Sequence, residues 1–207
     1  MLDTIFLDWS GTLVDDLEAV LAGTNEVFRS FGFPEMSRER FREEFELPVP
    51  RFYERVMPGI PFDALDKAFF EGFQRAQSSI RPLDAAEPFL RHASERGVRL
   101  RVLTTLDPDN AARQLAQFGW GGFFEEIHAG VLDKVPFLCE LVDELGLDRG
   151  RTAFVGDLPH DIDAGRAAGL RSCAVLSGYA SHDRLAESEP DWILPDVGSL
   201  SERLADR

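Results

Sequence analysis

The feature that most constrains the fold is an alternation of short apolar runs and amphipathic stretches, which begins at about residue 83. Short apolar runs between turn residues predict buried strands, and the longer amphipathic stretches predict helices. This alternation favours an α/β fold, in which a doubly wound parallel sheet carries helices on both faces. The expected strands are residues 100–103, 124–128, 152–155, 171–176 and 192–194, and the expected helices are 107–119, 134–145, 159–168 and 196–205.

One long segment interrupts the alternation. Residues 1–8 indicate a first strand, yet no second strand is expected for about 80 residues. Between them, residues 15–81 show helical spacing, as at Val20, Val27 and Phe31, and are punctuated by five prolines. The segment therefore predicts a small α-helical domain inserted after the first strand. The expected domains are an α/β core of residues 1–14 and 82–207 and a helical insert of residues 15–81.

Composition restricts the location and the partners. A formal net charge of −15 repels phosphate backbones, so we expect no nucleic-acid partner. No apolar run approaches the roughly 18 residues of a membrane span, and no basic patch precedes the apolar N-terminus as in a secretory signal. Cys139 and Cys173 indicate free thiols in a reducing compartment. We therefore expect a cytoplasmic protein without membrane contacts, and the oligomeric state stays open.

Polar residues follow several of the expected strands, at the point where each strand ends. Ligands of open parallel sheets bind beyond the carboxyl ends of the strands, so these residues are candidates for a site. Lys134, one of two lysines beside 20 arginines, opens a helix although the helix dipole disfavours a cation there. The candidates are Asp8, Ser10 and Thr12 after the first strand, then Thr104 and Thr105, Lys134, and Asp157, His160 and Asp161.

In order and spacing, these motifs resemble those of the haloacid dehalogenase-like hydrolase superfamily. The family pattern is an aspartate nucleophile in a DxDGT-like turn, a Thr or Ser after a strand, a lysine, and an acidic GDxxxD-like loop. Residues 156–169 are especially similar to the phosphoglycolate phosphatase-like branch, which places a cap domain where the helical insert lies. The resemblance covers residues 1–16 and 83–200, and its motifs are residues 8–12, Thr104, Lys134 and 156–161.

The resemblance implies a magnesium-dependent phosphatase that hydrolyses a small phosphorylated metabolite. A carboxylate can attack a phosphoryl group and form an acyl phosphate, which water then hydrolyses. A hard cation with oxygen ligands offsets the charge on the phosphoryl oxygens. Asp8 is the implied nucleophile, with Thr104 and Lys134 as its catalytic partners. The implied metal ligands are Asp8, Asp157, the Ser10 carbonyl and Asp161, which acts directly or through a bound water, and the implied phosphate-binding residues are Ser10, Thr104, Thr105 and Lys134.

Two candidates keep a simpler interpretation open. Asp161 lies near the third position of its expected helix, where the dipole alone favours an acidic residue. His160 either lines the site or lies on the surface. Neither residue is therefore assigned to chemistry by its position alone.

Ser10 is the position at which the sequence departs from the family. Phosphatase branches usually carry a second aspartate there, which protonates the leaving oxygen and then activates the hydrolytic water. A serine hydroxyl has no accessible change of charge near neutral pH. The sequence therefore keeps the nucleophile and the metal ligands but lacks the usual proton-transfer group, and His160 and Asp15 are the next candidates for that role.

Three interpretations of Ser10 compete. The favoured one is a phosphatase that uses another acid, a water or a good leaving group. The second is a phosphonatase-like C–P hydrolase, which has Trp after the nucleophile, as in Trp9, and needs a cap lysine, for which only Lys67 qualifies. The third is a weakened member that binds a phosphorylated ligand or a protein partner. Metal-free dehalogenase chemistry fits least, because it has no use for the acidic loop at 156–161. Substrate choice is assigned to the insert, where the candidates by type are Arg38, Arg42, Arg51, Tyr53 and Arg55.

Overall fold

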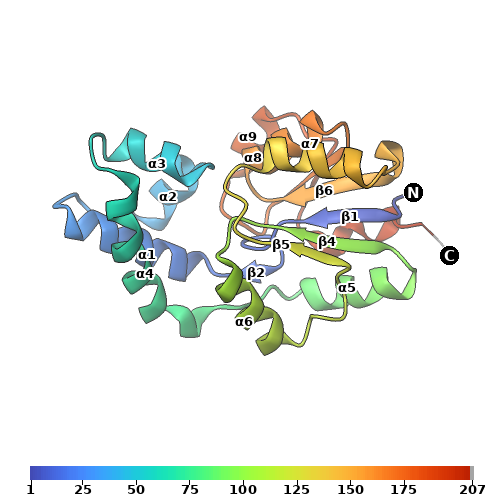
Figure 1. Ribbon diagram of the computed structural model, residues 1–207, viewed down its shortest axis with the longest axis horizontal. Coiled ribbons are helices and arrows are strands. Elements are labelled where there is room, and N and C mark those ends of the chain that lie inside the picture. Colours follow the sequence, from blue (N-terminus) through green and yellow to red (C-terminus); the bar gives the residue numbers. More distant parts are fainter. Residues whose placement is uncertain (206–207) are drawn as a thin grey trace.

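The computed structural model describes residues 1–205 and has an α/β architecture (Figure 1). Within these residues, a six-stranded parallel sheet has the order β5-β4-β1-β6-β7-β8. The expected doubly wound parallel sheet is thus confirmed. The strands are β1 (Thr4–Leu7), β4 (Arg99–Leu103), β5 (Glu126–His128), β6 (Thr152–Gly156), β7 (Arg171–Val175) and β8 (Trp192–Leu194).

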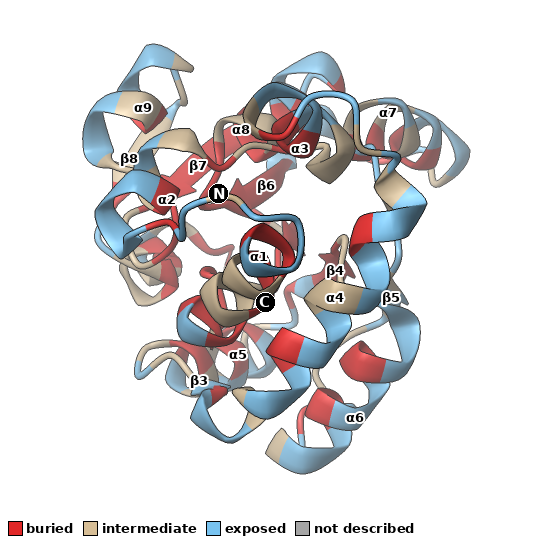
Figure 2. Ribbon diagram, turned by 90° about the vertical axis from the view of Figure 1, so that its left-hand side faces the viewer, coloured by how far each residue is buried: buried red, intermediate tan, exposed pale blue. Residues whose placement is uncertain are grey.

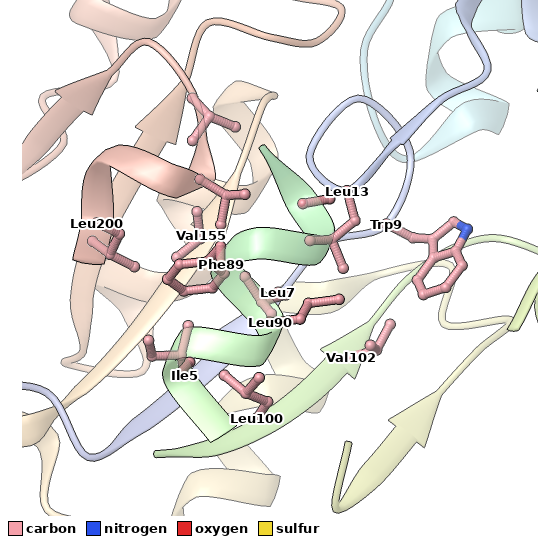
Figure 3. Packing of buried hydrophobic residues seen from close by; sticks show 14 of the residues in the cluster. Ile5, Leu7, Trp9, Leu13, Phe89, Leu90, Leu100, Val102, Val155 and Leu200 are labelled. Atoms are coloured by element: carbon pink, nitrogen blue, oxygen red, sulfur yellow. The ribbon is translucent and has the colours of Figure 1, made fainter. Parts of the chain in front are cut away.

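Helices cover both faces of this sheet, with α5 and α6 on one side and α7, α8 and α9 on the other (Figure 1). Successive side chains of a strand point to opposite faces. Ile5 and Leu7 of β1 therefore lie in the core on the α5 side (Figure 3), whereas Phe6 lies in the core that includes Leu138 of α7. The helices are α5 (Ala86–Glu95), α6 (Pro108–Phe118), α7 (Lys134–Glu144), α8 (Pro159–Ala167) and α9 (His182–Glu187).

The predicted insert is helical, and its helices lie beyond the carboxyl ends of the strands (Figures 1 and 2). We call residues 17–75 the helical segment. Helices α1 and α4 approach each other closely at two glycines, because a Cβ on Gly72 would lie 2.6 Å from the carbonyl oxygen of Ala22. The segment consists of α1 (Leu17–Ser30), α2 (Arg38–Glu44), α3 (Val49–Val56) and α4 (Phe62–Arg75), and a short 3₁₀ turn, η1 (Gln77–Ser79), follows it.

A short β ladder joins the two chain crossings between the sheet and the helical segment. β2 (Val14–Asp15) pairs antiparallel with β3 (Arg81–Pro82), and Arg81 forms an ion pair with Asp15 at 2.8 Å. The expectation of no further strand over about 80 residues was therefore wrong. Two-residue strands are too short to produce a periodic pattern. The division into two domains stays a prediction.

Capping residues and hydrophobic periodicity predicted most of the other helices and strands to within a few residues of their observed bounds. The Asp107 side chain caps α6 by accepting from the amides of Asp109 and Asn110, and Gly119 ends it with a left-handed φ of 71°. The expected final helix at 196–205 was wrong in type, since residues 197–203 form the 3₁₀ helix η3. Gly198 and two serines lower the α-helical propensity of this short segment. Helix α9 was not anticipated, and β5 is shorter than expected.

Candidate active site

Asp8 lies directly after β1, at the point where the order of the sheet reverses. β1 pairs with β4 on one side and with β6 on the other, and the chain visits these two sides in turn. Ligands of such sheets bind at this switch point, beyond the strand ends. The Asp8 amide donates to the carbonyl of Val155 at 2.9 Å, so the backbone fixes the carboxylate at the sheet edge. The side chain is buried.

Lys134 brings a buried positive charge to Asp8. Its Nζ lies 2.5 Å from Asp8 Oδ1 and 2.7 Å from Asp161 Oδ1, and its side chain is only 1% exposed. It is the first residue of α7, where the carboxylate of Asp133 accepts from the amide of Val135 and caps the helix. An ammonium at a helix N-terminus is locally unfavourable. The two carboxylates at hydrogen-bond distance supply the offsetting attraction.

Asp157 and Asp161 complete a buried acidic cluster with Asp8. One carboxylate oxygen from each of the three residues lies within 4.8 Å of the others. Asp157 follows β6, and Asp161 stands in the first turn of α8, where its Oδ2 accepts from the amide of Leu158 at 3.1 Å. Two neighbouring strand ends and the start of one helix therefore converge on a single point.

Glycines leave the space in which these carboxylates sit. A Cβ on Gly178 would lie 2.1 Å from Asp157 Oδ2, and a Cβ on Gly11 would lie 2.5 Å from the same atom. Gly11 also has φ +76°, a conformation that side chains rarely adopt. Tyr179, which follows Gly178, donates its amide to Asp157 Oδ2 at 2.6 Å. The loop after β7 thus positions Asp157, although no local pattern of residues indicates this contact.

The buried charges of the cluster shift one another's protonation. Burial raises the pKa of Asp8 to about 7, against the opposing attraction of Lys134. Burial and the charges of Asp8 and Asp161 raise the pKa of Asp157 well above its ordinary value. Burial lowers the pKa of Lys134, but its ion pairs with Asp161 and Asp8 outweigh burial and hold that pKa above the ordinary value. Three carboxylates around one ammonium leave an excess of negative charge, which a bound cation would offset.

Ser10 is held by a buried carboxylate that the sequence analysis did not single out. Its hydroxyl donates to Asp16 Oδ2 at 2.7 Å, and the Tyr179 hydroxyl donates to Asp16 Oδ1 at 2.5 Å. Asp16 is 1% exposed, and burial raises its pKa to about 6. Asp15, the substitute named from the sequence, instead pairs with Arg81 away from Ser10. Adjacent aspartates gave no signal as to which one turns inward.

The two threonines after β4 differ in their surroundings. Thr104 is buried, and its hydroxyl oxygen accepts from the amide of Leu106 at 3.1 Å, which leaves its hydrogen free for donation. Thr105 is half-buried and lines a cavity at the carboxyl ends of the strands. Both residues therefore lie at the expected edge of the sheet.

A cavity of about 270 Å³ separates the strand ends from the helical segment. On the sheet side it is lined by Asp8, Ser10, Asp16 and Thr105. On the helical side it is lined mainly by aromatic and aliphatic residues of α3, α4 and the chain before them. Lys134, Asp157 and Asp161 lie outside this lining. The helical-side residues include Phe45, Leu47, Val49, Tyr53, Leu65 and Phe73.

Several sequence-based candidates do not belong to the acidic cluster. His160 Nε2 accepts from the Lys134 amide at 3.2 Å, and burial lowers the pKa of the ring. The Lys67 side chain is 88% exposed on α4 and outside the cavity lining, near Glu71. Burial raises the pKa of the free Cys173 thiol to about 12, which removes it as a thiolate nucleophile. Of the five insert candidates, Tyr53 alone lines the cavity among the described residues, and Arg38, Arg42, Arg51 and Arg55 do not.

Comparison with known proteins assigns the family that this arrangement of strand ends indicates. Residues 5–175 match the model of a haloacid dehalogenase-like hydrolase family, and the chain belongs to that family. The resemblance drawn from the four motifs is thereby confirmed, and the protein is a hydrolase of this class. No helix within residues 1–205 is long and apolar enough to cross a bilayer.

Two of the matched relatives align over nearly the whole of both chains, but at low sequence identity. The chain is 27% identical over 205 residues to a phosphoglycolate phosphatase of Synechococcus elongatus, covering 96% of this chain and 95% of that protein. It is 23% identical over 206 residues to the pyrophosphatase PpaX of Halalkalibacterium halodurans, with the same coverage. A hydrolase structure from Pseudomonas syringae superposes with a TM-score of 0.83 at 16% identity, covering 97% of this chain and 96% of that chain. CbbY from Rhodobacter sphaeroides, in complex with phosphate, gives 0.76 at 24% over the same shares. At such identity the two structures show the fold alone.

Proposed function

We propose that the protein is a magnesium-dependent phosphatase, which hydrolyses a small phosphate monoester through a phospho-aspartate on Asp8. The observation that carries the proposal is the position of the Asp8 carboxylate. It lines the cavity at the switch point of the sheet, and it contacts Lys134 at 2.5 Å within the acidic cluster. The relatives named phosphoglycolate phosphatase and pyrophosphatase support phosphoryl chemistry.

The donor set fits magnesium. Carboxylate oxygens are the ligands that hard cations prefer, and the cluster offers three of them together with excess negative charge. Asp8 and Asp157 would hold the ion with the backbone carbonyl of Ser10, and Asp161 would act directly or through a bound water. When bound, magnesium offsets charge on the phosphoryl oxygens during transfer.

The protein's own side chains and amides each have a separate role in the reaction. The Asp8 carboxylate attacks phosphorus while the ester oxygen departs, and a water later cleaves the acyl phosphate to regenerate Asp8. Thr104 and the Thr105 amide donate to the phosphoryl oxygens. The Lys134 ammonium screens Asp8 from the approaching phosphate, which lowers the repulsion between two anions.

The Ser10–Asp16 pair supplies the proton that the departing oxygen needs. Ser10 lines the cavity with Asp8, and the oxygens of Ser10 and Asp16 are 2.7 Å apart, so a proton can pass from Asp16 through the serine hydroxyl. The same path in reverse accepts a proton from the hydrolytic water. This pair takes the part of the aspartate that Ser10 replaces.

The structure favours this function over the phosphonatase alternative. A Schiff-base lysine must reach the substrate carbonyl, and Lys67 is exposed outside the cavity lining. The intact cluster and the cavity beside it also favour an enzyme over a weakened binding protein. The partner is a small phosphorylated metabolite. Exclusion of nucleic acid and membranes, and a cytoplasmic location, stay predictions from the sequence.

A screen of phosphate esters with and without magnesium tests the proposal. We expect hydrolysis that requires magnesium and stops with a chelator, and a phosphorylated protein in acid-quenched turnover that loses its label in hydroxylamine. Hydrolysis that persists fully in chelator would contradict the metal requirement. Turnover without any hydroxylamine-sensitive label would contradict the phospho-aspartate.

A further inference from the structure

The charged side chains that line the cavity all carry the same sign as a phosphate ester. Among the residues that the structure describes, the charged side chains lining the cavity are Asp8, Asp16, Asp66 and Asp107, all of them carboxylates. A leaving group that carries its own negative charge, such as glycolate or phosphate, would meet repulsion from them. The cavity therefore disfavours anionic leaving groups.

No arginine of the helical segment lines the cavity among the described residues, and several of these arginines are engaged elsewhere. Arg38 pairs with Glu18 at 2.9 Å, and Arg55 pairs with Glu46 at 2.8 Å. Arg42 donates to the carbonyl of Ala180 at 3.2 Å. Each of these contacts lies outside the cavity lining. A carboxylate or second phosphate on the substrate would thus find no arginine from this segment.

Exposed apolar side chains meet at the cavity from both sides. Phe70 of α4 is 43% exposed, Leu132 before α7 is 57% exposed, and both line the cavity. Exposed large apolar residues that converge on one concave site indicate a partner that covers them. An apolar ligand would bury both and gain free energy from each methylene removed from water.

The size of the cavity limits this ligand. Its volume is about 270 Å³, whereas an apolar cavity of roughly 150 Å³ accommodates a benzene ring. A six-carbon chain or ring therefore fits with its phosphoryl group directed at Asp8. A long lipid chain would extend past the mouth.

From these observations we infer that the substrate is the phosphate monoester of an uncharged, apolar alcohol or phenol of about six to eight carbons. The inference rests on the proposed phosphatase function, and it separates this chain from relatives whose names specify anionic leaving groups. Apolar residues of the helical segment and Leu132 would bind the organic group. The sheet edge would bind the phosphoryl group.

A series of straight-chain alkyl phosphates tests the inference, because chain length changes apolar area with little change in leaving-group basicity. From ethyl to hexyl phosphate, we expect kcat/KM to rise about fourfold for each of the four added methylenes, or about 250-fold in total. Phosphoglycolate and glycerol phosphate should fall below hexyl phosphate. A flat series, or phosphoglycolate as the better substrate, would overturn the inference.

A charge placed at the cavity mouth sharpens the test. Phe70→Arg should lower kcat/KM for hexyl phosphate about tenfold and raise it for phosphoglycolate. Phe31→Arg is the matched control, since Phe31 is 36% exposed on the same segment but outside the cavity lining. It should leave both values unchanged. Equal effects of the two substitutions would contradict a role for Phe70 in selecting the leaving group.

Binding of hexylphosphonate and methylphosphonate, measured by calorimetry with magnesium, separates the two proposals. If no ester is hydrolysed but hexylphosphonate binds at least tenfold more tightly, the ligand class stands and the phosphatase function fails. If esters are hydrolysed without a preference for long chains, the phosphatase function stands and the apolar class fails. If neither hydrolysis nor selective binding occurs, both are overturned.

Discussion

The two sides of the cavity differ in polarity and in the interactions that hold them. The sheet side consists of buried charged groups at strand ends, held by hydrogen bonds of 2.5–3.1 Å, as among Asp8, Lys134 and Asp161. The helical side consists mainly of apolar side chains from α3 and α4, held by packing, with Asp66 of α4 among them. Hydrogen bonds to a fixed backbone orient a group, whereas packing sets only shape and volume. In the proposed function, the sheet side therefore performs the reaction and the helical side selects the substrate.

The largest expected effect is on the sheet side. Asp8→Asn should lower kcat/KM by about 10⁴-fold or more for every ester, because the amide cannot attack phosphorus. Steady-state kinetics on hexyl and nitrophenyl phosphate measure it. Asp15→Asn is the matched control, since that residue pairs with Arg81 outside the cavity, and it should be near wild type. A folded Asp8→Asn protein within tenfold of wild type would disprove the covalent mechanism.

Proton transfer gives the next effect, and it depends on the leaving group. Asp16→Asn should slow alkyl phosphate hydrolysis by about 10²–10⁴-fold and nitrophenyl phosphate hydrolysis much less, because nitrophenolate departs without a proton. Exchanging the two residues, as Ser10→Asp with Asp16→Ser, should restore alkyl hydrolysis by placing the carboxylate at position 10. Unchanged alkyl rates in Asp16→Asn would remove Asp16 from the mechanism.

The same carboxylate should cost stability. Burial raises the pKa of Asp16 in the folded protein from 3.8 to about 6. Asp16 therefore leaves the folded state most stable below about pH 4, and this stability is lost as the pH rises through 6. Asp16→Asn should therefore increase the free energy of unfolding by about 2–3 kcal/mol at pH 8, with no such gain at pH 4. Urea titrations in chelator measure this. A gain that does not vary with pH would rule out the buried charge as its cause.

The smallest expected effect is on the helical side. A Cβ on Gly72 would meet the Ala22 carbonyl oxygen at 2.6 Å and Gly23 Cα at 2.9 Å, so Gly72→Ala forces α1 and α4 apart. We expect a loss of about 1–2 kcal/mol of stability, despite the helical preference for alanine, and a weaker chain-length preference. Gly121→Ala, with no atom within 4 Å of its Cβ, is the control. Unchanged stability and selectivity would show that this contact does not shape the cavity.

The difference between the two sides also explains what the sequence could predict. Asp8, Lys134, Asp157 and Asp161 follow strands or open helices, and local periodicity places such positions without knowledge of tertiary contacts. Their convergence then follows from the rule that strand ends of a parallel sheet face one ligand site. The fold class and the acidic cluster could therefore be predicted from the sequence.

The residues that escaped prediction depend on contacts between distant segments. The turning of Asp16 toward Ser10, rather than Asp15, is settled by the Tyr179 hydroxyl, 163 positions away. The arginines of the helical segment matched a phosphate-binding role by type, but carboxylates and a carbonyl outside the cavity lining engage Arg38, Arg55 and Arg42. Two-residue strands and a 3₁₀ helix leave too little pattern for detection.

The position of β1 at the centre of the sheet has a consequence for biosynthesis. Asp8 emerges early from the ribosome, but Lys134 follows 126 positions later and Tyr179 later still. Until Lys134 has been made, Asp8 has no ammonium beside it, and until the loop after β7 has been made, Asp157 lacks the amide of Tyr179 as a donor. Closing such long loops is slow relative to forming local helices. The helical segment can therefore form first, and the acidic cluster is completed only when the later strands and loops have been made.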